Sequence, residues 1–265
     1  MAGKTPIDLD RLAADLAHGD SAVVERAVRR LQAGMGRLGD ADYRRAVEAL
    51  CSLFYVDTAD RPDLEAALDR ATSLLARQGT KVVPLLISQM QSSDIKSHLY
   101  LARTLGRIGS DALSRLRDLL ATSEDPYSRA FALYAIGKMD CADVVRALPE
   151  VLGGLMHPDK EVRDSAARAL GKIAAVAPPR RLTPPRRREK FAARLRATRD
   201  PEPPVRAKAM RSLGKMAAAG LLNLQQKRTV SAAARAALGE SEEYAWDNAY
   251  IVRREARETL ELLTR

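Results

Sequence analysis

A twelve-residue motif that recurs along the chain constrains the fold more strongly than any other feature. Its clearest copies are SRAFALYAIGKM (128–139), VRDSAARALGKI (162–173), VRAKAMRSLGKM (205–216) and VRREARETLELL (252–263), the last without the glycine. Residues 97–109 fit the same frame, and residues 25–39 and 68–79 fit it more loosely. Self-similarity of this kind is typical of repeat proteins, in which every copy forms the same supersecondary unit.

Apolar residues within each copy recur at helical spacing. In the second of these copies they are Val162, Ala166, Ala169, Leu170 and Ile173, which form one stripe of a helix. A less regular apolar helix precedes each copy, so each unit is predicted to be a hairpin of two helices. Stacked hairpins cover one another's apolar faces and form a solenoid. Aromatic residues make up only 4% of the chain, which favours close-packed helices over a β-sandwich.

The copies together predict an all-α fold, an α-solenoid of about seven helical hairpins in a single array over residues 1–265. The expected hairpins are 7–38, 41–78, 80–109, 110–139, 141–175, 185–219 and 222–264. The last copy loses its glycine and ends in LELLTR, as terminal repeats do when one face meets water.

An aspartate in the turn before each of the last two copies adds a second signature. Asp200 lies six positions before Arg206, and Asp247 lies six positions before Arg253. An Asp in the turn, then Val-Arg, then Ala-x-x-Ala-Leu-Gly-Lys-Ile resembles the HEAT repeat, in particular the short bacterial HEAT-like repeats of the phycobilisome-lyase type. The resemblance is clearest over residues 92–263. It implies that each Asp–Arg pair ties one repeat to the next.

Two copies depart from the aspartate signature. His157 stands where an Asp would precede the 162–173 copy, and Asp159 is a candidate substitute. Ser123 stands at the matching position one copy earlier, with Asp125 nearby. The fold prediction depends on neither departure.

A Pro/Arg-rich inter-repeat loop is predicted at residues 177–190, APPRRLTPPRRREK. The interval between successive register glycines rises from 34 to 43 residues across it, and Thr183 followed by Pro184 predicts the start of the next helix. Pro178–Arg199 has a net charge of +8, most of the chain's +10. Two interpretations stay open: a stiff loop with a solvated basic helix face, or a contact for phosphate or an acidic partner. The candidate contact residues are Arg180, Arg181, Arg186, Arg187 and Arg188.

Basic residues recur at matching positions of the copies, directly after the register glycine and one turn earlier. Because second helices line the concave side of a solenoid, these positions predict a basic stripe with aromatic rings at its middle. The stripe comprises Arg37, Arg77, Tyr100, Arg103, Arg107, Phe131, Tyr134, Lys138, Arg168, Lys172, Lys208, Arg211 and Lys215. Such a surface suits an anionic chain. A cation near a helix C-terminus is also favoured by the helix dipole, by about 0.3–1 kcal/mol, so repeat consensus is an equal explanation. The rings belong to the core if the register is wrong by one residue.

No catalytic or metal-binding constellation stands out in the sequence. His18, His98 and His157 fall in different repeats, and the two cysteines are 90 positions apart without a CxxC pair. The motifs of zinc peptidases, α/β-hydrolases and phosphate-binding loops are absent. The sole tryptophan, Trp246, lies in the final turn, which matches HEAT-like DNA glycosylases poorly. We expect no enzyme activity, no metal and no cofactor.

The expected function is that of a non-catalytic scaffold or adaptor, which binds an acidic segment of a protein partner through the basic stripe and the Arg-rich loop. Sequence-nonspecific binding of a nucleic-acid backbone is the first alternative. An accessory subunit of an enzyme, such as a chromophore lyase or a HEAT-like DNA glycosylase, is the second. No apolar run reaches 18 residues and the N-terminus lacks the apolar region of a signal peptide, so a cytoplasmic protein without a membrane span is expected. No small-molecule ligand is inferred.

Overall fold

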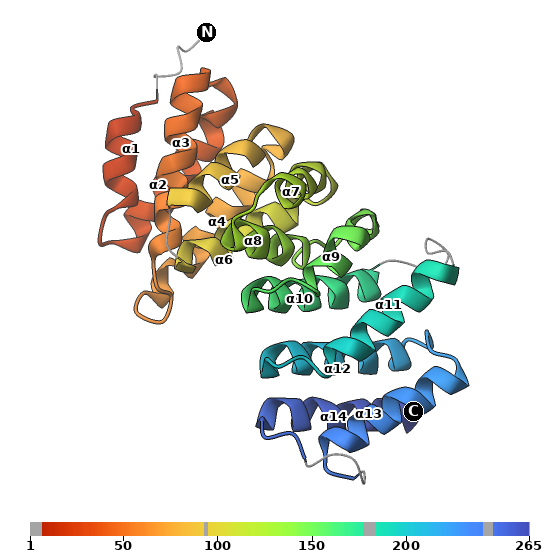
Figure 1. Cartoon of the computed structure of the whole chain (residues 1–265). Coiled ribbons are helices and arrows are strands. Elements are labelled where there is room, and N and C mark those ends of the chain that lie inside the picture. The colour runs from red at the N-terminus through yellow and green to blue at the C-terminus, as the bar shows by residue number, and fades with distance from the viewer. Residues whose placement is uncertain (1–6, 93–94, 177–183, 241–245, 265) are drawn as a thin grey trace. The chain divides into compact units, whose positions relative to one another are not determined.

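The chain is helical throughout the part that the structure describes. The structure is a computed structural model, and it describes residues 7–92, 95–176, 184–240 and 246–264. Fourteen α-helices and no β-strand occur among these residues (Figure 1). In chain order the hairpins are α1 (Leu9–Leu16) with α2 (Ser21–Gly34), α3 (Asp40–Ser52) with α4 (Glu65–Ala76), α5 (Val83–Ser92) with α6 (Ile95–Ile108), α7 (Ser110–Thr122) with α8 (Pro126–Ile136), α9 (Leu148–Gly154) with α10 (Lys160–Val176), α11 (Pro184–Ala197) with α12 (Pro203–Ala218), and α13 (Leu224–Ala237) with α14 (Tyr250–Thr264). The prediction of an all-α solenoid of about seven hairpins is confirmed.

The chain divides into two compact units, residues 1–115 and 116–265, and the division falls within α7. We call them the N-terminal unit and the C-terminal unit. The expectation of a single array over 1–265 concerns how these two units join, and it stays a prediction.

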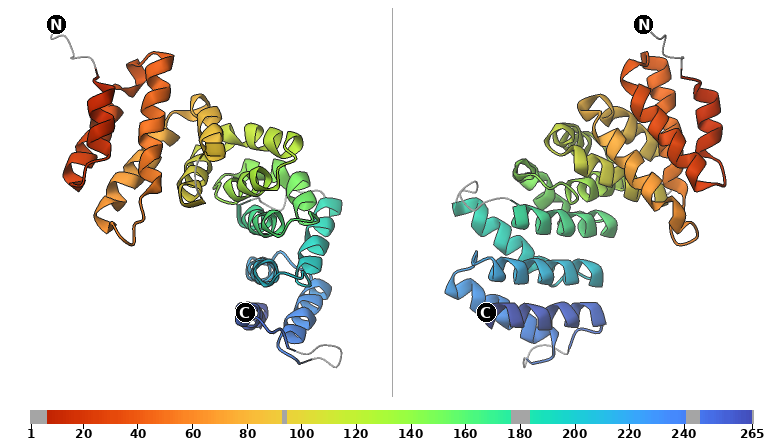
Figure 2. Two further views of the ribbon diagram at one scale, coloured as in Figure 1. Left: turned by 60° about the vertical axis from the view of Figure 1, so that its left-hand side comes forward. Right: turned by 180° about the vertical axis from the view of Figure 1, so that it is seen from behind.

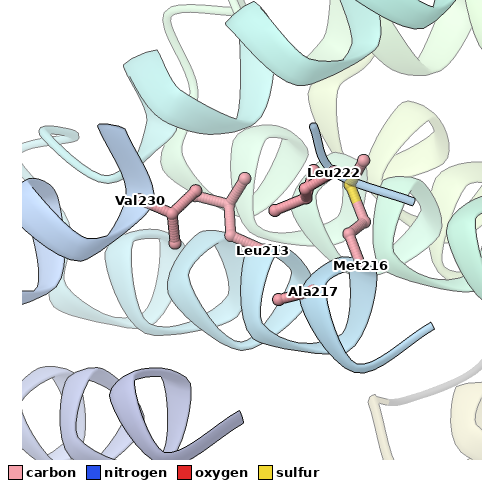
Figure 3. Packing of buried hydrophobic residues seen from close by; sticks show 5 residues of the cluster. All are labelled: Leu213, Met216, Ala217, Leu222 and Val230. Atoms are coloured by element: carbon pink, nitrogen blue, oxygen red, sulfur yellow. The ribbon is translucent and has the colours of Figure 1, made fainter. Parts of the chain in front are cut away.

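Second helices form one layer of the C-terminal unit. Helix α10 packs against both α8 and α12, and α12 packs against α14. In Figures 1 and 2, α10, α12 and α14 run side by side, while α11 and α13 cross one face of this row obliquely as a second layer. The core lies between the layers. Figure 3 shows part of it, where Leu213, Met216 and Ala217 of α12 meet Leu222 and Val230.

The N-terminal unit repeats the same two-layer arrangement. Its second helices α2, α4 and α6 pack in succession, and its first helices α1, α3 and α5 do the same. The apolar stripes explain this order, because each helix has a buried face that only the next repeat can cover.

Two of the register glycines allow successive second helices to approach closely. A Cβ at Gly214 would lie 2.7 Å from Thr259 Oγ1 of α14, and one at Gly137 would lie 3.3 Å from the backbone nitrogen of Ala169 in α10. Gly171 has more room, since its nearest neighbour there would be Ser212 Oγ at 3.8 Å. The glycine of the motif therefore serves helix–helix packing, which explains why the terminal copy can do without it.

The loop predicted at residues 177–190 is shorter than expected. Helix α11 begins at Pro184, as the Thr-Pro signal predicted, so residues 184–190 belong to a helix and not to a loop. Proline is tolerated in a first turn because that turn's N–H groups have no intrahelical acceptor. The rest of the predicted loop, 177–183, lies outside the described residues.

Candidate partner-binding surface

Two Asp–Arg rungs tie consecutive repeats of the C-terminal unit together. The guanidinium of Arg163 donates to both oxygens of Asp200, over 2.8 and 3.2 Å, and Arg206 donates to both oxygens of Asp247, over 2.7 and 2.8 Å. Each arginine also donates to carbonyls of its own turn, as Arg163 does to His157. All four side chains are largely buried. The inter-repeat role that the family resemblance implied is thus observed, but each aspartate side chain pairs with the arginine of the preceding copy and not with the arginine six positions later, which donates to its backbone carbonyl.

The corresponding Asp–Arg pair is missing one repeat earlier. In the aligned copies, Arg129 corresponds to Arg163 and Arg206, and position 157 corresponds to Asp200 and Asp247 but is a histidine. The Nη1 of Arg129 donates to the Ser123 carbonyl, but its buried Nε has no acceptor in the described part of the chain. Asp159 does not substitute, because its Oδ1 caps α10 by accepting from the backbone of Glu161 and Val162.

Replacing His157 with Asp is expected to raise the free energy of unfolding by about 1 kcal/mol, because the new carboxylate would accept from the orphaned Arg129 Nε. The local turn would persist, since His157 Nδ1 now accepts from the Asp159 N–H as Asp200 Oδ1 accepts from the Glu202 N–H. Urea unfolding followed by tryptophan fluorescence would measure the gain.

A double-mutant cycle controls this prediction. In an Arg129→Met background, His157→Asp should no longer stabilise the protein. An equal gain in both backgrounds would show that the aspartate acts on the turn and not through Arg129.

In the N-terminal unit, the predicted stripe residues make mostly local contacts. Arg37 and Arg77 are exposed and donate to carbonyls of their own turns. Arg107 donates to Asp69 Oδ1 over 2.6 Å, which neutralises its charge. Tyr100 stacks on the buried ring of Phe54, with the two centroids 5.3 Å apart.

Arg103 completes this group. Its guanidinium carbon lies 5.3 Å from the centroid of the Tyr100 ring, and it has no carboxylate partner among the described residues. Of the stripe cations on α6, Arg103 is therefore unpaired, whereas Arg107 is paired.

In the C-terminal unit, one tyrosine lies between two cations. The Nζ of Lys138 is 4.9 Å from the centroid of the Tyr134 ring, and the guanidinium carbon of Arg168 is 5.0 Å from it. Neither cation pairs with a carboxylate within the described ranges, and the buried Nε of Arg168 has no hydrogen-bond acceptor there. We call Tyr134, Lys138 and Arg168 the tyrosine–cation cluster. It joins the C-terminal end of α8 to the middle of α10.

Phe131, predicted as a surface ring, belongs to the core. Its side chain is only 5% exposed, so the prediction for this residue is wrong. Helix α8 is apolar on most of its circumference, and its sequence therefore does not show which aromatic residue faces outward.

The remaining stripe cations on α10 and α12 are mostly paired. Lys172 Nζ lies 3.0 Å from Asp140, and Lys208 pairs with Asp164. Arg211 donates through both Nε and Nη2 to Glu255, which is 1% exposed. The exposed Lys215 has no carboxylate partner in the described part of the chain.

Burial alone would raise the pKa of Glu255, but hydrogen bonds from Arg211 and Arg254 outweigh it and lower that pKa below its usual value. The carboxylate therefore stays ionised and neutralises the arginines beside it. Sequence reasoning missed these acids, although Asp164 and Glu255 are visible at the third and fourth positions of the aligned copies.

Of the predicted loop arginines, two can be placed as surface residues. Arg187 and Arg188 are exposed on the first turns of α11, and Arg186 lies on the same helix. Arg180 and Arg181 lie outside the described residues.

The same helix buries two cations that the sequence did not single out. Arg194 is 1% exposed and donates to the Ser212 hydroxyl over 2.6 Å, to the Lys190 carbonyl over 3.1 Å and to the Leu170 carbonyl. Burial lowers the pKa of Arg194 to about 9. Lys190 is 4% exposed, and burial together with the charge of Arg194 lowers its pKa to about 7. Both residues look like part of the basic run in the sequence, but they serve the packing of α11.

The described ranges hold neither a cluster of metal ligands nor a membrane-spanning helix. No group of three or more His, Cys, Asp or Glu side chains is placed there to hold a metal ion. Nor does any of the described helices combine the length and apolarity that crossing a bilayer requires.

Fold and surface together define a class of protein, an α-solenoid whose second helices present a layer of mixed charge. The HEAT-repeat family model matches residues 113–196. The match includes α8 and α10, which carry the tyrosine–cation cluster. No curated protein matches the sequence.

The chain aligns with solved structures of repeat proteins. The chain aligns with Kap121p bound to Pho4p at a TM-score of 0.57 and 16% identity, over 97% of this chain and 34% of that one. A designed armadillo repeat protein in complex with the peptide (KR)4 aligns at a TM-score of 0.44 and 18% identity, over 97% and 100% of the two chains. The complex of CpcE and CpcF of phycocyanin lyase from Nostoc sp. aligns at a TM-score of 0.42 and 24% identity, over 63% and 97%. At 16% identity, the alignment with Kap121p shows a common fold and nothing further.

Proposed function

We propose that the chain is a non-catalytic scaffold that binds an acidic segment of another protein at the tyrosine–cation cluster. One observation carries the proposal: Lys138 and Arg168 face the same ring without a carboxylate partner in the described ranges, whereas their neighbours on α10 and α12 are paired. The free cysteines, Cys51 and Cys141, suit a reducing compartment, so we place this function in the cytoplasm.

An incoming carboxylate would satisfy groups that the protein itself leaves unsatisfied. Arg168 is half-buried and its guanidinium has no carboxylate partner in the described ranges, so a carboxylate bound at its accessible edge would gain a charge-assisted hydrogen bond without displacing another protein group. Tyr134 holds both cations in place, because a cation over a ring gains about 0.5–1 kcal/mol at an exposed site. The cluster is therefore ordered before a partner arrives, which lowers the entropy lost on binding.

A protein segment fits this surface better than a nucleic-acid backbone. A phosphate chain needs a continuous track of unpaired cations. Here Lys172, Lys208 and Arg211 already pair with Asp140, Asp164 and Glu255, so the track is interrupted. Discrete acidic side chains on a peptide can use a short cluster. The solenoid fold is compatible with this role, since Kap121p of the same fold is bound to Pho4p.

Fluorescence anisotropy with a labelled octa-glutamate peptide and a labelled single-stranded DNA tests the proposal. The native chain should bind the peptide, and Lys138→Gln combined with Arg168→Gln should weaken binding at least tenfold, a loss of about 1.4 kcal/mol. Lys172→Gln is the matched control, because Lys172 is already paired with Asp140 and its loss should change the affinity little.

Two results would overturn the proposal. The first is peptide binding that the double variant leaves unchanged. The second is DNA binding that is tighter than peptide binding and falls linearly with the logarithm of salt concentration, because that response reports phosphate neutralisation.

A further inference from the structure

The first hairpin of the N-terminal unit borders an open, basic surface cavity that the proposed function does not use. Its volume is about 400 Å³, and it opens between α1 and α2. The cavity is lined by Arg11 and Asp15 of α1, His18 of the connecting turn, and Val23, Arg26 and Arg30 of α2. We call it the arginine cavity.

Positive charge in this cavity is only weakly compensated. The single contact of its one carboxylate is with Arg30, whose Nη1 lies 3.9 Å from Asp15 Oδ2. Arg11 and Arg26 have no carboxylate within salt-bridge distance in the described part of the chain. Two of the three guanidinium groups therefore have no carboxylate partner among the described residues, and the third has only a distant one.

Helix α2 itself provides the contrast. Arg29, between Arg26 and Arg30 in sequence, donates to Glu25 over 2.6 Å and does not line the cavity. The unpaired Arg26 and the weakly paired Arg30 thus both lie on the cavity side of the helix. An exposed arginine without a ligand gains little there, since surface ion pairs contribute only about 0–1 kcal/mol.

The histidine of the turn adds a further donor. His18 Nδ1 accepts a hydrogen bond from the Asp20 N–H over 3.0 Å, so in the neutral ring the proton lies on Nε2. Apart from Asp15, every polar side chain that lines the cavity is therefore a hydrogen-bond donor.

We propose that the arginine cavity binds a phosphate monoester. A phosphate dianion has acceptors in several directions, and planar guanidinium groups bind such oxygens in pairs. Asp15 fits a monoester that retains one proton, because its carboxylate can accept that O–H. The ester belongs either to a phosphorylated serine of a peptide or to a small metabolite, and the two sources share this chemistry.

Isothermal titration calorimetry on the full chain tests the site, with inorganic phosphate, phosphoserine, and one serine peptide in phosphorylated and unphosphorylated forms. Phosphoserine should bind, and Arg26→Gln combined with Arg30→Gln should weaken it at least tenfold. Arg29→Gln is the control on the same helix: it removes one positive charge outside the cavity, against two in the test variant, and its affinity should match that of the native chain. Circular dichroism of both variants checks that the fold is kept.

Each outcome has a defined meaning. Tighter binding of the phosphopeptide than of phosphoserine, with none to the unphosphorylated form, supports a peptide source, and equal binding supports a metabolite. No binding of any phosphate probe would overturn the proposal, as would an equal loss in the Arg29 variant, because attraction would then depend on overall charge. These probes and variants leave Lys138 and Arg168 intact, so failure here does not bear on the tyrosine–cation cluster.

Discussion

Lys190→Met is expected to raise the free energy of unfolding of the C-terminal unit by about 4 kcal/mol at pH 6. Lys190 lies on α11 with only 4% of its surface exposed, and no carboxylate among the described residues pairs with its ammonium. Burial, and secondly the charge of Arg194, lower its pKa from 10.5 to about 7. Methionine has a similar shape and no charge to desolvate, so the substitution removes the penalty of a buried, unpaired cation.

The pH dependence of this effect has a definite sign. Between about pH 7 and 10.5 the unfolded chain binds a proton at Lys190 that the folded chain does not, so the stability of the native protein rises with pH over this interval. Below pH 7 both states are protonated and the full penalty is present. The advantage of the methionine variant should therefore be largest at pH 6 and approach zero near pH 10.5.

Urea unfolding at pH 6, 8 and 10 would measure the effect. Trp246 is the only tryptophan and lies against the guanidinium of Arg253, 4.1 Å from the ring centroid, so its fluorescence reports on the C-terminal unit. Lys215→Met is the control, because Lys215 is exposed and its loss should change stability little. A Lys190→Met protein that is less stable than the native one at pH 6 would contradict the prediction and indicate that the ammonium has a stabilising partner.

Arg206→Ala is expected to lower the free energy of unfolding by about 3 kcal/mol, the second largest effect. Asp247 would lose two hydrogen bonds while its side chain stays about one-tenth exposed, and the carbonyls of Asp200 and Pro201 would lose a donor. Removing one partner of a buried pair leaves the other charge uncompensated, which costs more than the pair itself contributes. Arg206→Lys should recover only part of the loss, because an ammonium cannot donate to both carboxylate oxygens in one plane.

This loss should also depend on pH. Burial by itself would raise the pKa of Asp247. The hydrogen bonds from Arg206 and from the Ala249 N–H together outweigh burial, so the pKa lies below its usual value of 3.8. The rung therefore contributes stability at neutral pH, and the contribution disappears as pH falls through the folded-state pKa. The difference between the native chain and the alanine variant should shrink below pH 4.

Thermal unfolding followed by circular dichroism would test the rung. Arg235→Ala is the matched control, since Arg235 and Glu240 form an exposed pair whose side chains retain half or more of their surface. If the two alanine variants lose the same stability, the Asp–Arg rung contributes no more to the free energy of unfolding than a surface ion pair does. The structural role assigned to the rung would then be wrong.

The repeat motif determined the fold at the level of helices and their pairing. Seven hairpins follow from the apolar period, the glycine register and the capping residues, because these signals are local and a solenoid adds only contacts between neighbouring repeats. The two Asp–Arg rungs were predictable for the same reason: their partners lie one repeat apart and recur at the same register.

Tertiary structure alone decided which charges are available to a partner. Arg168 and Arg211 occupy equivalent positions of two copies, yet one faces Tyr134 and the other is held by a buried glutamate. Lys190 and Arg194 read as part of a basic run and are buried against neighbouring helices. The arginine cavity was not predicted at all. Whether a charge is neutralised depends on side chains that lie one helix away in space and 30 to 45 residues away in sequence. The local sequence around the charged residue does not show whether such a side chain reaches it.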